Sequence, residues 1–159
     1  MLKNHWTPGL AFLDKRGIYP RYEARCPLRS TILRRATRAV SASYDVALAP
    51  SGPRITQFSV LRTLARFGPL PINRLAAEAA LDRSTMGRNL DPLERRGLVM
   101  LKVGETDQRQ RVAHLTAAGE LAIEAALPYW RKAQKRFAPL IENAAIGKLT
   151  EQLAALRSS

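Results

Sequence analysis

The sequence is poor in the residues that build disulfide frameworks, metal sites and catalytic triads. It contains one cysteine, Cys26, and two histidines, His5 and His114, among 159 residues. A single cysteine excludes an intrachain disulfide and is typical of proteins in a reducing cytoplasm. The two histidines have neither metal-ligand nor triad spacing, and the chain has no glycine-rich phosphate loop. No metal or cofactor is therefore predicted, and an enzyme is the weakest of the interpretations.

Long apolar runs and acidic residues are also scarce. No apolar run approaches the roughly 18 residues that a membrane-spanning helix needs. The N-terminal stretch MLKNHWTPGLAFLDKR lacks the uninterrupted apolar segment of a signal peptide. These absences predict a cytoplasmic protein with no membrane partner. Asp plus Glu number 13 against 26 Lys plus Arg, a net charge of +13. That excess favours a nucleic-acid partner, although an arginine-rich proteome would give the same balance.

A length of 159 residues predicts one domain with a substantial core. Residues 1–25 mix proline, glycine, aromatic and charged residues without a period, so we expect an irregular N-terminal arm. In residues 26–53 apolar side chains recur every four positions, which predicts a helix ended by Pro50, Gly52 and Pro53. The apolar stripe comprises Leu28, Ile32, Ala36, Val40, Tyr44 and Leu48.

Residues 54–116 predict three helices followed by a β-hairpin. Thr56 is the expected N-cap of the first helix, and the Gly68-Pro69 pair ends it. A short second helix follows, and Leu81 lies in the turn after it. The inward-facing residues of the short helix are Ile72, Leu75, Ala76 and Ala79.

The third of these helices, the fourth in the chain, is expected to begin after Asp82, whose carboxylate accepts backbone N–H bonds near Thr85. Gly97 suits the left-handed position after the helix. Residues 98–103 and 111–115 are rich in β-formers and flank a polar loop, so they predict the hairpin. The expected buried face of the helix is Met86, Leu90 and Leu93.

Helix, turn, helix and hairpin occur in the order of a winged helix-turn-helix. The first two turns of the fourth helix carry small and polar side chains, which fit a major groove about 12 Å wide. Arg88 suits a bidentate pair with guanine and Asn89 a pair with adenine, although a solvated surface arginine is the alternative for Arg88. The predicted DNA-binding residues of this helix are Arg83, Ser84, Thr85, Gly87, Arg88 and Asn89.

The tip of the hairpin carries Asp107, Arg109 and Arg111, which we also predict to bind DNA. An arginine at this position can enter a narrow, A·T-rich minor groove, where negative potential is concentrated. Asp107 is expected to brace the Arg109 guanidinium through a charge-assisted hydrogen bond. A flexible charged loop is the alternative.

Residues 117–159 predict two further helices. Thr116 is the expected cap of a long helix that reaches Phe137 and is kinked at Pro128. Long amphipathic helices at both ends of the sequence favour a homodimer, unless they pack on each other within one chain. The last helix carries a narrow apolar seam of Ile146, Leu149, Leu153 and Leu156. The fold class is therefore mainly α with a small β-hairpin wing, a winged helix-turn-helix lobe plus long terminal dimerisation helices.

These segments together resemble the MarR family of bacterial transcription regulators, over about residues 28–157. The resemblance implies a homodimeric repressor on a pseudo-palindromic operator, released by a small aromatic or phenolic compound or by oxidation. The segments that carry it are LDRSTMGRNLDPLERRGLV (81–99), Asp107-x-Arg109 leading into HLTAAG (114–119), TQFSVLRTLARFGPLPINRLA (56–76), LRRATRAVSASYD (33–45) and ALPYWRKAQ (126–134).

The chain departs from the family pattern at its cysteine. Some members sense hydroperoxides through a cysteine near the start of the first long helix, where this chain has Ser30, with Cys26 one turn earlier. The wing loop also lacks the early basic run of many members. His114 is expected to be a structural hairpin residue. The aromatics best placed to line the effector pocket that the resemblance implies are Tyr44, Phe58, Tyr129 and Trp130.

Two functions of different classes stay open at this point. The first is a ligand-responsive DNA-binding repressor. The second is a winged-helix RNA-binding or protein-interaction module without an operator. A palindromic, salt-sensitive preference for duplex DNA would distinguish them.

Overall fold

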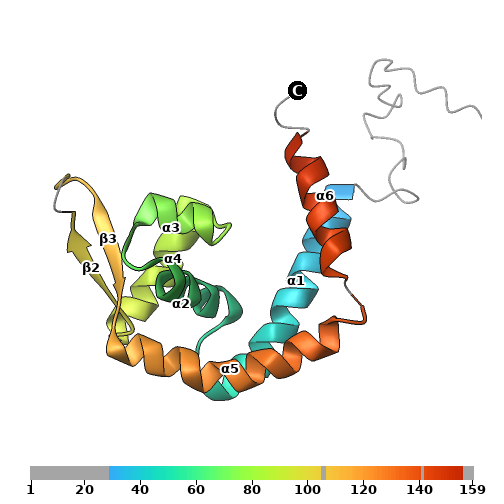
Figure 1. The fold of residues 1–159 in the computed structure, drawn as a ribbon, viewed down its shortest axis with the longest axis horizontal. Coiled ribbons are helices and arrows are strands. Elements are labelled where there is room, and N and C mark those ends of the chain that lie inside the picture. Colours follow the sequence, from blue (N-terminus) through green and yellow to red (C-terminus); the bar gives the residue numbers. More distant parts are fainter. Residues whose placement is uncertain (1–28, 105–106, 141, 156–159) are drawn as a thin grey trace, which may run out of the picture. The chain divides into compact units, whose positions relative to one another are not determined.

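The structure is a computed structural model that describes residues 29–104, 107–140 and 142–155 (Figure 1). The expectations for the arm 1–25, for Cys26 and for the apolar residues Leu28 and Leu156 lie outside the described residues. The chain forms two compact units, Met1–Arg38 and Ala39–Ser159.

The described residues are mainly helical, with one small antiparallel sheet, as the sequence predicts (Figure 1). The elements are α1 (Arg29–Leu48), the 3-10 helix η1 (Ala49–Ser51), α2 (Ile55–Phe67), β1 (Leu70–Pro71), α3 (Ile72–Glu78), α4 (Arg83–Arg95), β2 (Val99–Val103), β3 (Arg111–Leu115), α5 (Ala117–Phe137) and α6 (Asn143–Ala155).

The residues of the predicted apolar stripe of α1 belong to both units and differ in exposure. In the first unit, Ile32 is 49% exposed. In the second unit, Leu48 is fully buried and Tyr44 is half-buried.

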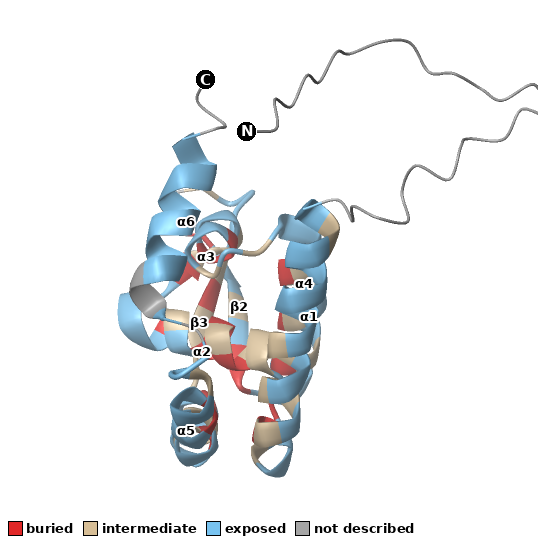
Figure 2. Cartoon of the chain, turned by 90° about the vertical axis from the view of Figure 1, so that its right-hand side faces the viewer, coloured by how far each residue is buried: buried red, intermediate tan, exposed pale blue. Residues whose placement is uncertain are grey.

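The main core lies inside a lobe formed by α2, α3, α4 and the sheet (Figure 2). Each helix contributes the apolar face that its spacing predicts, because residues three and four apart share one side of a helix. Met86, Leu90 and Leu93 of α4 are all buried, as expected. The buried residues of this core are Val60, Leu61, Leu64, Leu70, Leu75, Ala76, Met86, Leu90, Leu93, Leu98, Val99 and Ala113.

The ends of α4 follow the sequence prediction. Asp82 caps the helix through a 2.8 Å bond from the backbone N–H of Thr85 to its carboxylate. At the other end, Gly97 has φ +68°, a left-handed conformation that glycine adopts without a steric penalty. Pro92 lies within the helix, which continues to Arg95.

The start of α2 differs from the prediction for Thr56. The helix begins at Ile55 with Arg54 as its N-cap residue, and the Gln57 side chain accepts a bond from the Arg54 backbone N–H at 3.1 Å. The Thr56 hydroxyl instead donates to Asn89 Oδ1 of α4 at 2.8 Å. The expectation that Thr56 is the cap is therefore wrong, because the pairing of Arg54 with Gln57 starts the helix two residues earlier.

The predicted hairpin is present as β2 and β3, which pair in antiparallel register from Val99–Leu115 to Val103–Arg111. The sheet has a third strand, β1, on the other side of β3, which the sequence did not predict. β1 has two residues, too few to show an alternating pattern. Its Pro71 lacks a backbone N–H, which is tolerated on an edge strand.

Helix α5 begins after Thr116, whose hydroxyl accepts the Gly119 N–H at 3.1 Å, and it runs through Pro128 to Phe137 as predicted. Its first turn lies very close to the base of the hairpin. A Cβ added at Gly119 would lie 2.2 Å from the Leu98 carbonyl oxygen, so only glycine fits there.

A second, smaller core joins α1, α2 and α5 through Leu48, Phe58 and Ala126. By contrast, the side chains of α6 from Ala145 onward are exposed (Figure 2). Within the part of the chain that the structure describes, no helix is long and apolar enough to cross a bilayer.

Candidate nucleic-acid interface

The N-terminal turns of α4 present a polar surface. Arg83, Ser84 and Arg88 are exposed, whereas Thr85 and Gly87 are half-buried. The buried face of the same helix is occupied by the core, so this polar face is the one available to a ligand. Asn89 is half-buried as well, so all six predicted contact residues of α4 lie at least partly open to solvent on neighbouring turns.

Asp82 organises the start of this surface. The Ser84 hydroxyl donates to Asp82 Oδ1 at 2.6 Å, and the Thr85 hydroxyl donates to Oδ2 at 2.6 Å. These bonds, with the Thr85 backbone N–H, hold the pKa of Asp82 well below its usual range, because they stabilise the ionised carboxylate. The first turn of α4 is thus held by a cap that is ionised at neutral pH.

Arg88 and Asn89 differ in their freedom to contact a ligand. Arg88 is exposed and donates one bond to the Ser84 hydroxyl at 3.2 Å, which leaves most of its donors directed to solvent. Asn89 donates to the Thr85 carbonyl at 2.8 Å and accepts from Thr56. Its amide therefore joins α4 to α2, in addition to any role toward a ligand.

The wing tip is a compact turn. Asp107 Oδ1 accepts the backbone N–H of Arg109 at 2.9 Å, and Oδ2 accepts the Gln110 side-chain amide at 3.1 Å. The expected brace between Asp107 and the Arg109 guanidinium is therefore replaced by a bond to the backbone. A short turn brings the carboxylate next to the N–H two residues on, a common arrangement for aspartate. Arg109 and Arg111 remain exposed.

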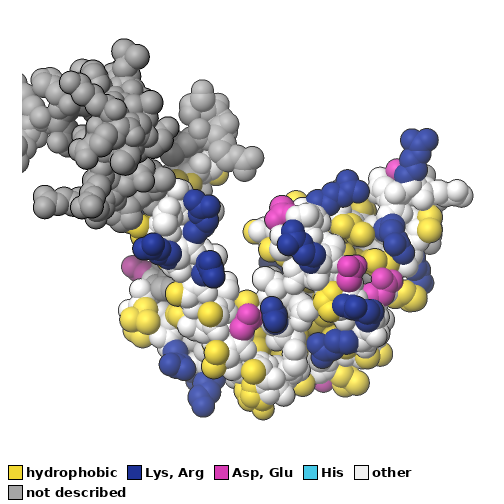
Figure 3. Space-filling model, turned by 180° about the vertical axis from the view of Figure 1, so that it is seen from behind, with side chains coloured by type: hydrophobic (Ala, Val, Ile, Leu, Met, Phe, Trp, Pro, Cys, Tyr) yellow, Lys and Arg dark blue, Asp and Glu magenta, His cyan; other side chains and the backbone are white. Residues whose placement is uncertain are grey.

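Basic side chains are spread over the molecular surface. Figure 3 shows Lys and Arg side chains over much of one face, with fewer acidic ones. Within the described residues, no group of three or more His, Cys, Asp or Glu could hold a metal ion.

The four aromatics predicted to line an effector pocket are distributed over three grooves. Tyr129 lines a groove between α1 and α5, Tyr44 and Trp130 line a second, and Phe58 and Trp130 line a third between α2 and α5. Phe58 is only 1% exposed and belongs to the small core. The structure therefore brings Phe58 and Trp130 together, at 6.2 Å between ring centroids, but not all four residues.

Tyr44 is tied into the α1–α5 contact. Its hydroxyl donates to Gln134 Oε1, and its ring stacks on Phe137 at 4.9 Å between centroids. Burial raises the pKa of the Tyr44 phenol, so it is a neutral donor at physiological pH. These contacts indicate a structural part for Tyr44 as much as a ligand-binding one.

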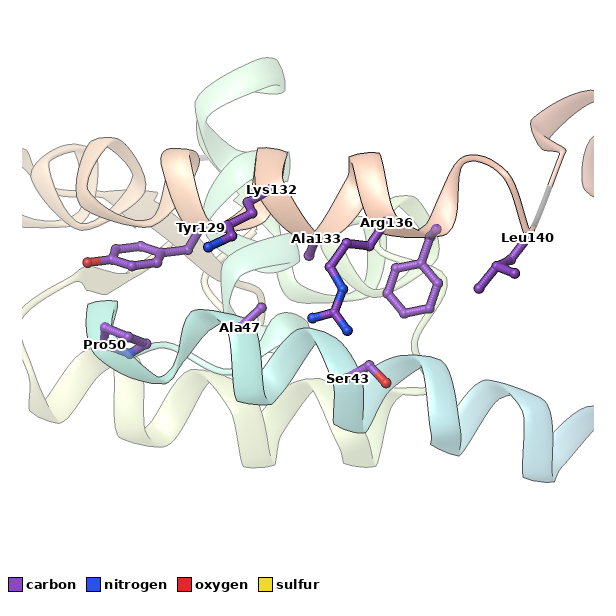
Figure 4. Close-up of a pocket in the computed structure, with 9 residues that line it drawn as sticks. Ser43, Ala47, Pro50, Tyr129, Lys132, Ala133, Arg136 and Leu140 are labelled. Carbon is purple, nitrogen blue, oxygen red and sulfur yellow. The ribbon is translucent and has the colours of Figure 1, made fainter.

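The groove that contains Tyr129 is largely apolar and has a volume of about 630 Å³. Figure 4 shows Arg136 extending from α5 toward α1 across this groove. Lys132 lies one turn earlier on the same helix. An apolar groove with two cations suits an organic anion. Sequence reasoning missed Lys132 and Arg136, for which the only signal was their spacing of four in a helix.

Arg62 of α2 was also missed. Its guanidinium carbon lies 4.5 Å from the Trp130 ring centroid and 5.9 Å from that of Phe58. These distances are typical of cation–π interactions. The sequence gives no sign of them, because Arg62 and Trp130 are far apart along the chain.

Comparison with known proteins places these features in a family. The model of the MarR family matches residues 54–110, which contain α2 to the wing tip. A search of curated proteins found no match. Among solved structures, the transcriptional regulator MosR of M. tuberculosis has 31% identity and a TM-score of 0.73, covering 84% of this chain and 98% of that one.

Two further structures were solved with ligands. MosR in complex with DNA has 33% identity and a TM-score of 0.71, covering 82% of this chain and 98% of that one. CouR from Rhodococcus jostii RHA1, bound to p-coumaroyl-CoA, has 25% identity and a TM-score of 0.63, covering 80% of this chain and 90% of that one.

Proposed function

The chain belongs to the MarR family of transcriptional regulators, and on that premise we propose that it is a homodimeric repressor of a pseudo-palindromic operator. A small aromatic acid binds the protein and releases it from the DNA. The protein acts in the cytoplasm on double-stranded DNA, without a metal or cofactor. The proposed dimerisation segments are residues 26–53 and 117–159, and residues 54–116 form the DNA-binding lobe.

The observation that carries the proposal is the exposed polar face at the start of α4. Asp82 holds this first turn in place, and Arg88 extends from it with most of its donors unused. Arg88 pairs with a guanine in each half-site. Arg83, Ser84 and Thr85 contact the backbone and groove walls, while Gly87 allows close approach. Asn89 contributes to base contact from the edge of this surface.

The wing supplies the second contact. Its tip is stiffened by Asp107, which binds two groups of the turn, so that Arg109 is presented from a defined backbone. Arg109 enters the minor groove beside each half-site, and Arg111 binds a phosphate.

The experiment that tests the function is selection of the purified protein against a random pool of DNA duplexes at about 150 mM salt. A pseudo-palindrome with half-sites about one helical turn apart is the expected result. Retention of duplexes without sequence preference would contradict an operator and favour the RNA-binding or protein-interaction alternative.

Arg88→Ala tests the base contact directly. We expect it to weaken operator binding by about 1–3 kcal/mol and to relax the preference at one base pair in each half-site. Arg131→Ala, which removes the same charge from an exposed position on α5, is the control. Equal losses of affinity for the operator and for random duplex, measured by fluorescence anisotropy, would contradict base reading by Arg88.

The effector is proposed to bind the groove between α1 and α5, with its ring beside Tyr129 and its carboxylate toward Lys132 and Arg136. The support is the apolar lining with two cations, and a family member of 25% identity that was solved with p-coumaroyl-CoA. Tyr44, Phe58 and Trp130 shape the neighbouring contacts. A panel of aromatic acids and their thioesters should contain a compound that releases the operator, and Arg136→Ala should weaken that response. Release that is equally strong in the variant would place the effector elsewhere.

A further inference from the structure

A separate groove of about 510 Å³ lies between the first turn of α2 and the exposed side of α4. Arg54, the N-cap residue of α2, and Gln57 in its first turn line one side, and Arg88 lines the other side from α4. Both arginines are exposed, and Gln57 is half-buried. This groove is distinct from the grooves along α5, and it shares Arg88 with the proposed base-reading surface.

The groove presents hydrogen-bond donors and positive charge. Its two side-chain amide oxygens already accept bonds, Gln57 Oε1 from the Arg54 backbone and Asn89 Oδ1 from Thr56. The Nε2 end of the Gln57 amide and the two guanidinium groups are the donors that remain. Among the described residues that line the groove, none is acidic. Such a lining attracts an anion and repels a cation.

We infer that this groove holds a backbone phosphate of the DNA, gripped between Arg54 and Gln57 beside the base-reading face of α4. The inference rests on the proposed DNA binding and adds α2 to the interface. The main support is that the groove is continuous with the proposed base-reading face of α4, because Arg88 borders both. When α4 enters the major groove, the sugar-phosphate strand at the edge of that groove passes beside the helix, where this groove opens.

Arg54→Ala is the first test. We expect affinity to fall by about three- to tenfold at 150 mM salt, equally for operator and random duplex, because a phosphate carries no sequence information. The slope of log K against log salt should become shallower by about 0.9 for each bound protomer. Arg66→Ala is the matched control, since it removes the same charge from the last turn of the same helix. An unchanged slope for Arg54→Ala, or an equal change for Arg66→Ala, would overturn the inference.

Gln57→Glu tests the groove without disturbing the fold. A glutamate keeps the oxygen that accepts the Arg54 backbone N–H, and a negative charge near a helix start is favourable. The thermal stability should therefore be retained while DNA affinity falls at least threefold. Lys148→Gln, on α6, gives the same change in net charge and should leave affinity unchanged. If Gln57→Glu bound DNA as tightly as wild type, the inference would be wrong.

Duplexes with a single neutral methylphosphonate linkage locate the phosphate. At one position in each half-site, the neutral linkage should lower the DNA affinity of the wild-type protein. The same linkage should cause no further loss of affinity in Arg54→Ala. Full additivity at every position would overturn the inference.

A free phosphate is the competing occupant. Inorganic phosphate, compared with chloride at equal ionic strength, should give no stabilisation that depends on Arg54. If inorganic phosphate did stabilise the protein through Arg54, and Arg54→Ala bound DNA as tightly as wild type, the groove would be assigned to a small anion. A wild type that selects no operator would refute the proposed function itself, whereas a normal operator with unaffected variants would refute only this phosphate contact.

Discussion

At the scale of single residues, Asp82 has more bonds than an ordinary helix cap requires. It accepts from both Ser84 and Thr85 as well as from the helix backbone. Ser84 in turn accepts a bond from Arg88. One carboxylate thereby fixes the small residues of the proposed DNA-binding surface and, through Ser84, the direction of the Arg88 side chain.

Asp82→Ala should lower both the melting temperature and operator affinity, because the cap and the fixed hydroxyls are lost together. The pKa of Asp82 is lowered in the folded protein, so the folded state binds its proton less readily than the unfolded state does. Its stabilising effect is therefore complete above the ordinary aspartate pKa of about 3.9 and declines as pH falls below it. Urea titrations should show a difference between wild type and Asp82→Ala that is constant from pH 6 to 8 and smaller at pH 3.

Asp82→Asn is the control for this prediction. Asparagine caps helices about as well as aspartate, and it does not titrate. Its stability relative to Asp82→Ala should therefore show no decline at low pH. A constant difference between wild type and Asp82→Ala down to pH 3 would contradict the proposed charge effect.

Residue type predicts bonds that close within a few positions of the chain. The caps at Asp82 and Thr116 and the left-handed Gly97 were all predictable, because each depends only on its own turn. The pairing of Thr56 with Asn89 was not, since those residues are 33 positions apart and meet only when α2 packs on α4. The predicted bond between Asp107 and the Arg109 guanidinium was wrong for a more local reason. Arg109 has two kinds of donor, its backbone N–H and its guanidinium, and the backbone N–H takes the Asp107 carboxylate.

At the scale of elements, the junction of α5 with the hairpin is the tightest contact around any described glycine. Gly119 lies under the Leu98 carbonyl and the Leu115 side chain. The Thr116 hydroxyl also donates to the Gly97 carbonyl at 2.7 Å. The start of α5 is therefore held to the base of the wing by both shape and hydrogen bonding.

Gly119→Ala should destabilise the protein by about 1–3 kcal/mol, because the new methyl would overlap a backbone oxygen that cannot move aside easily. Gly147→Ala is the matched control on α6, where an added Cβ meets no atom within 4 Å. There the same change should stabilise the helix by about 0.5–1 kcal/mol. Urea unfolding measures both, and equal effects at the two positions would contradict the close approach.

Elements longer than two turns were predictable from their apolar spacing, and the strands of the hairpin from their β-formers. β1 was not, because its two residues form a strand only by pairing with β3. The candidate sites likewise include features that the sequence predicts and features that it does not. Exposure of Arg83, Ser84 and Arg88 follows from helix periodicity, whereas the grooves depend on how α1, α2 and α5 pack.

At the scale of the whole molecule, the single chain leaves an apolar seam open. Ile146, Leu149 and Leu153 of α6 are 46%, 42% and 43% exposed. Three large apolar side chains at seam spacing are unfavourable in water, so they favour a second copy of the chain as their cover. The proposed dimer would bury them.

Replacing Leu149 and Leu153 together by glutamate should convert the dimer to a monomer in sedimentation. Operator affinity should fall by more than about tenfold, because only one half-site is then bound at a time. Lys148→Glu gives the same change of two units in net charge on the same helix and is the control. A double variant that sediments as a tight dimer would place the dimer contact elsewhere.

The close contact between the start of α5 and the base of the hairpin at Gly119 also bears on how the two elements can move. Helix α5 is a rod of 21 residues, about 30 Å long, fixed at one end to the wing and bordering the α1 groove at the other. The middle of α5 is packed on the two cores through Ile123 and Ala126, so a movement of the helix is also felt inside the lobe. A displacement of about 2.5 Å at the groove end would correspond to a tilt of about 5° over this length, which the close contact at Gly119 would pass to the base of the hairpin. In the proposed complex with DNA, such a tilt would move the wing arginines relative to the minor groove.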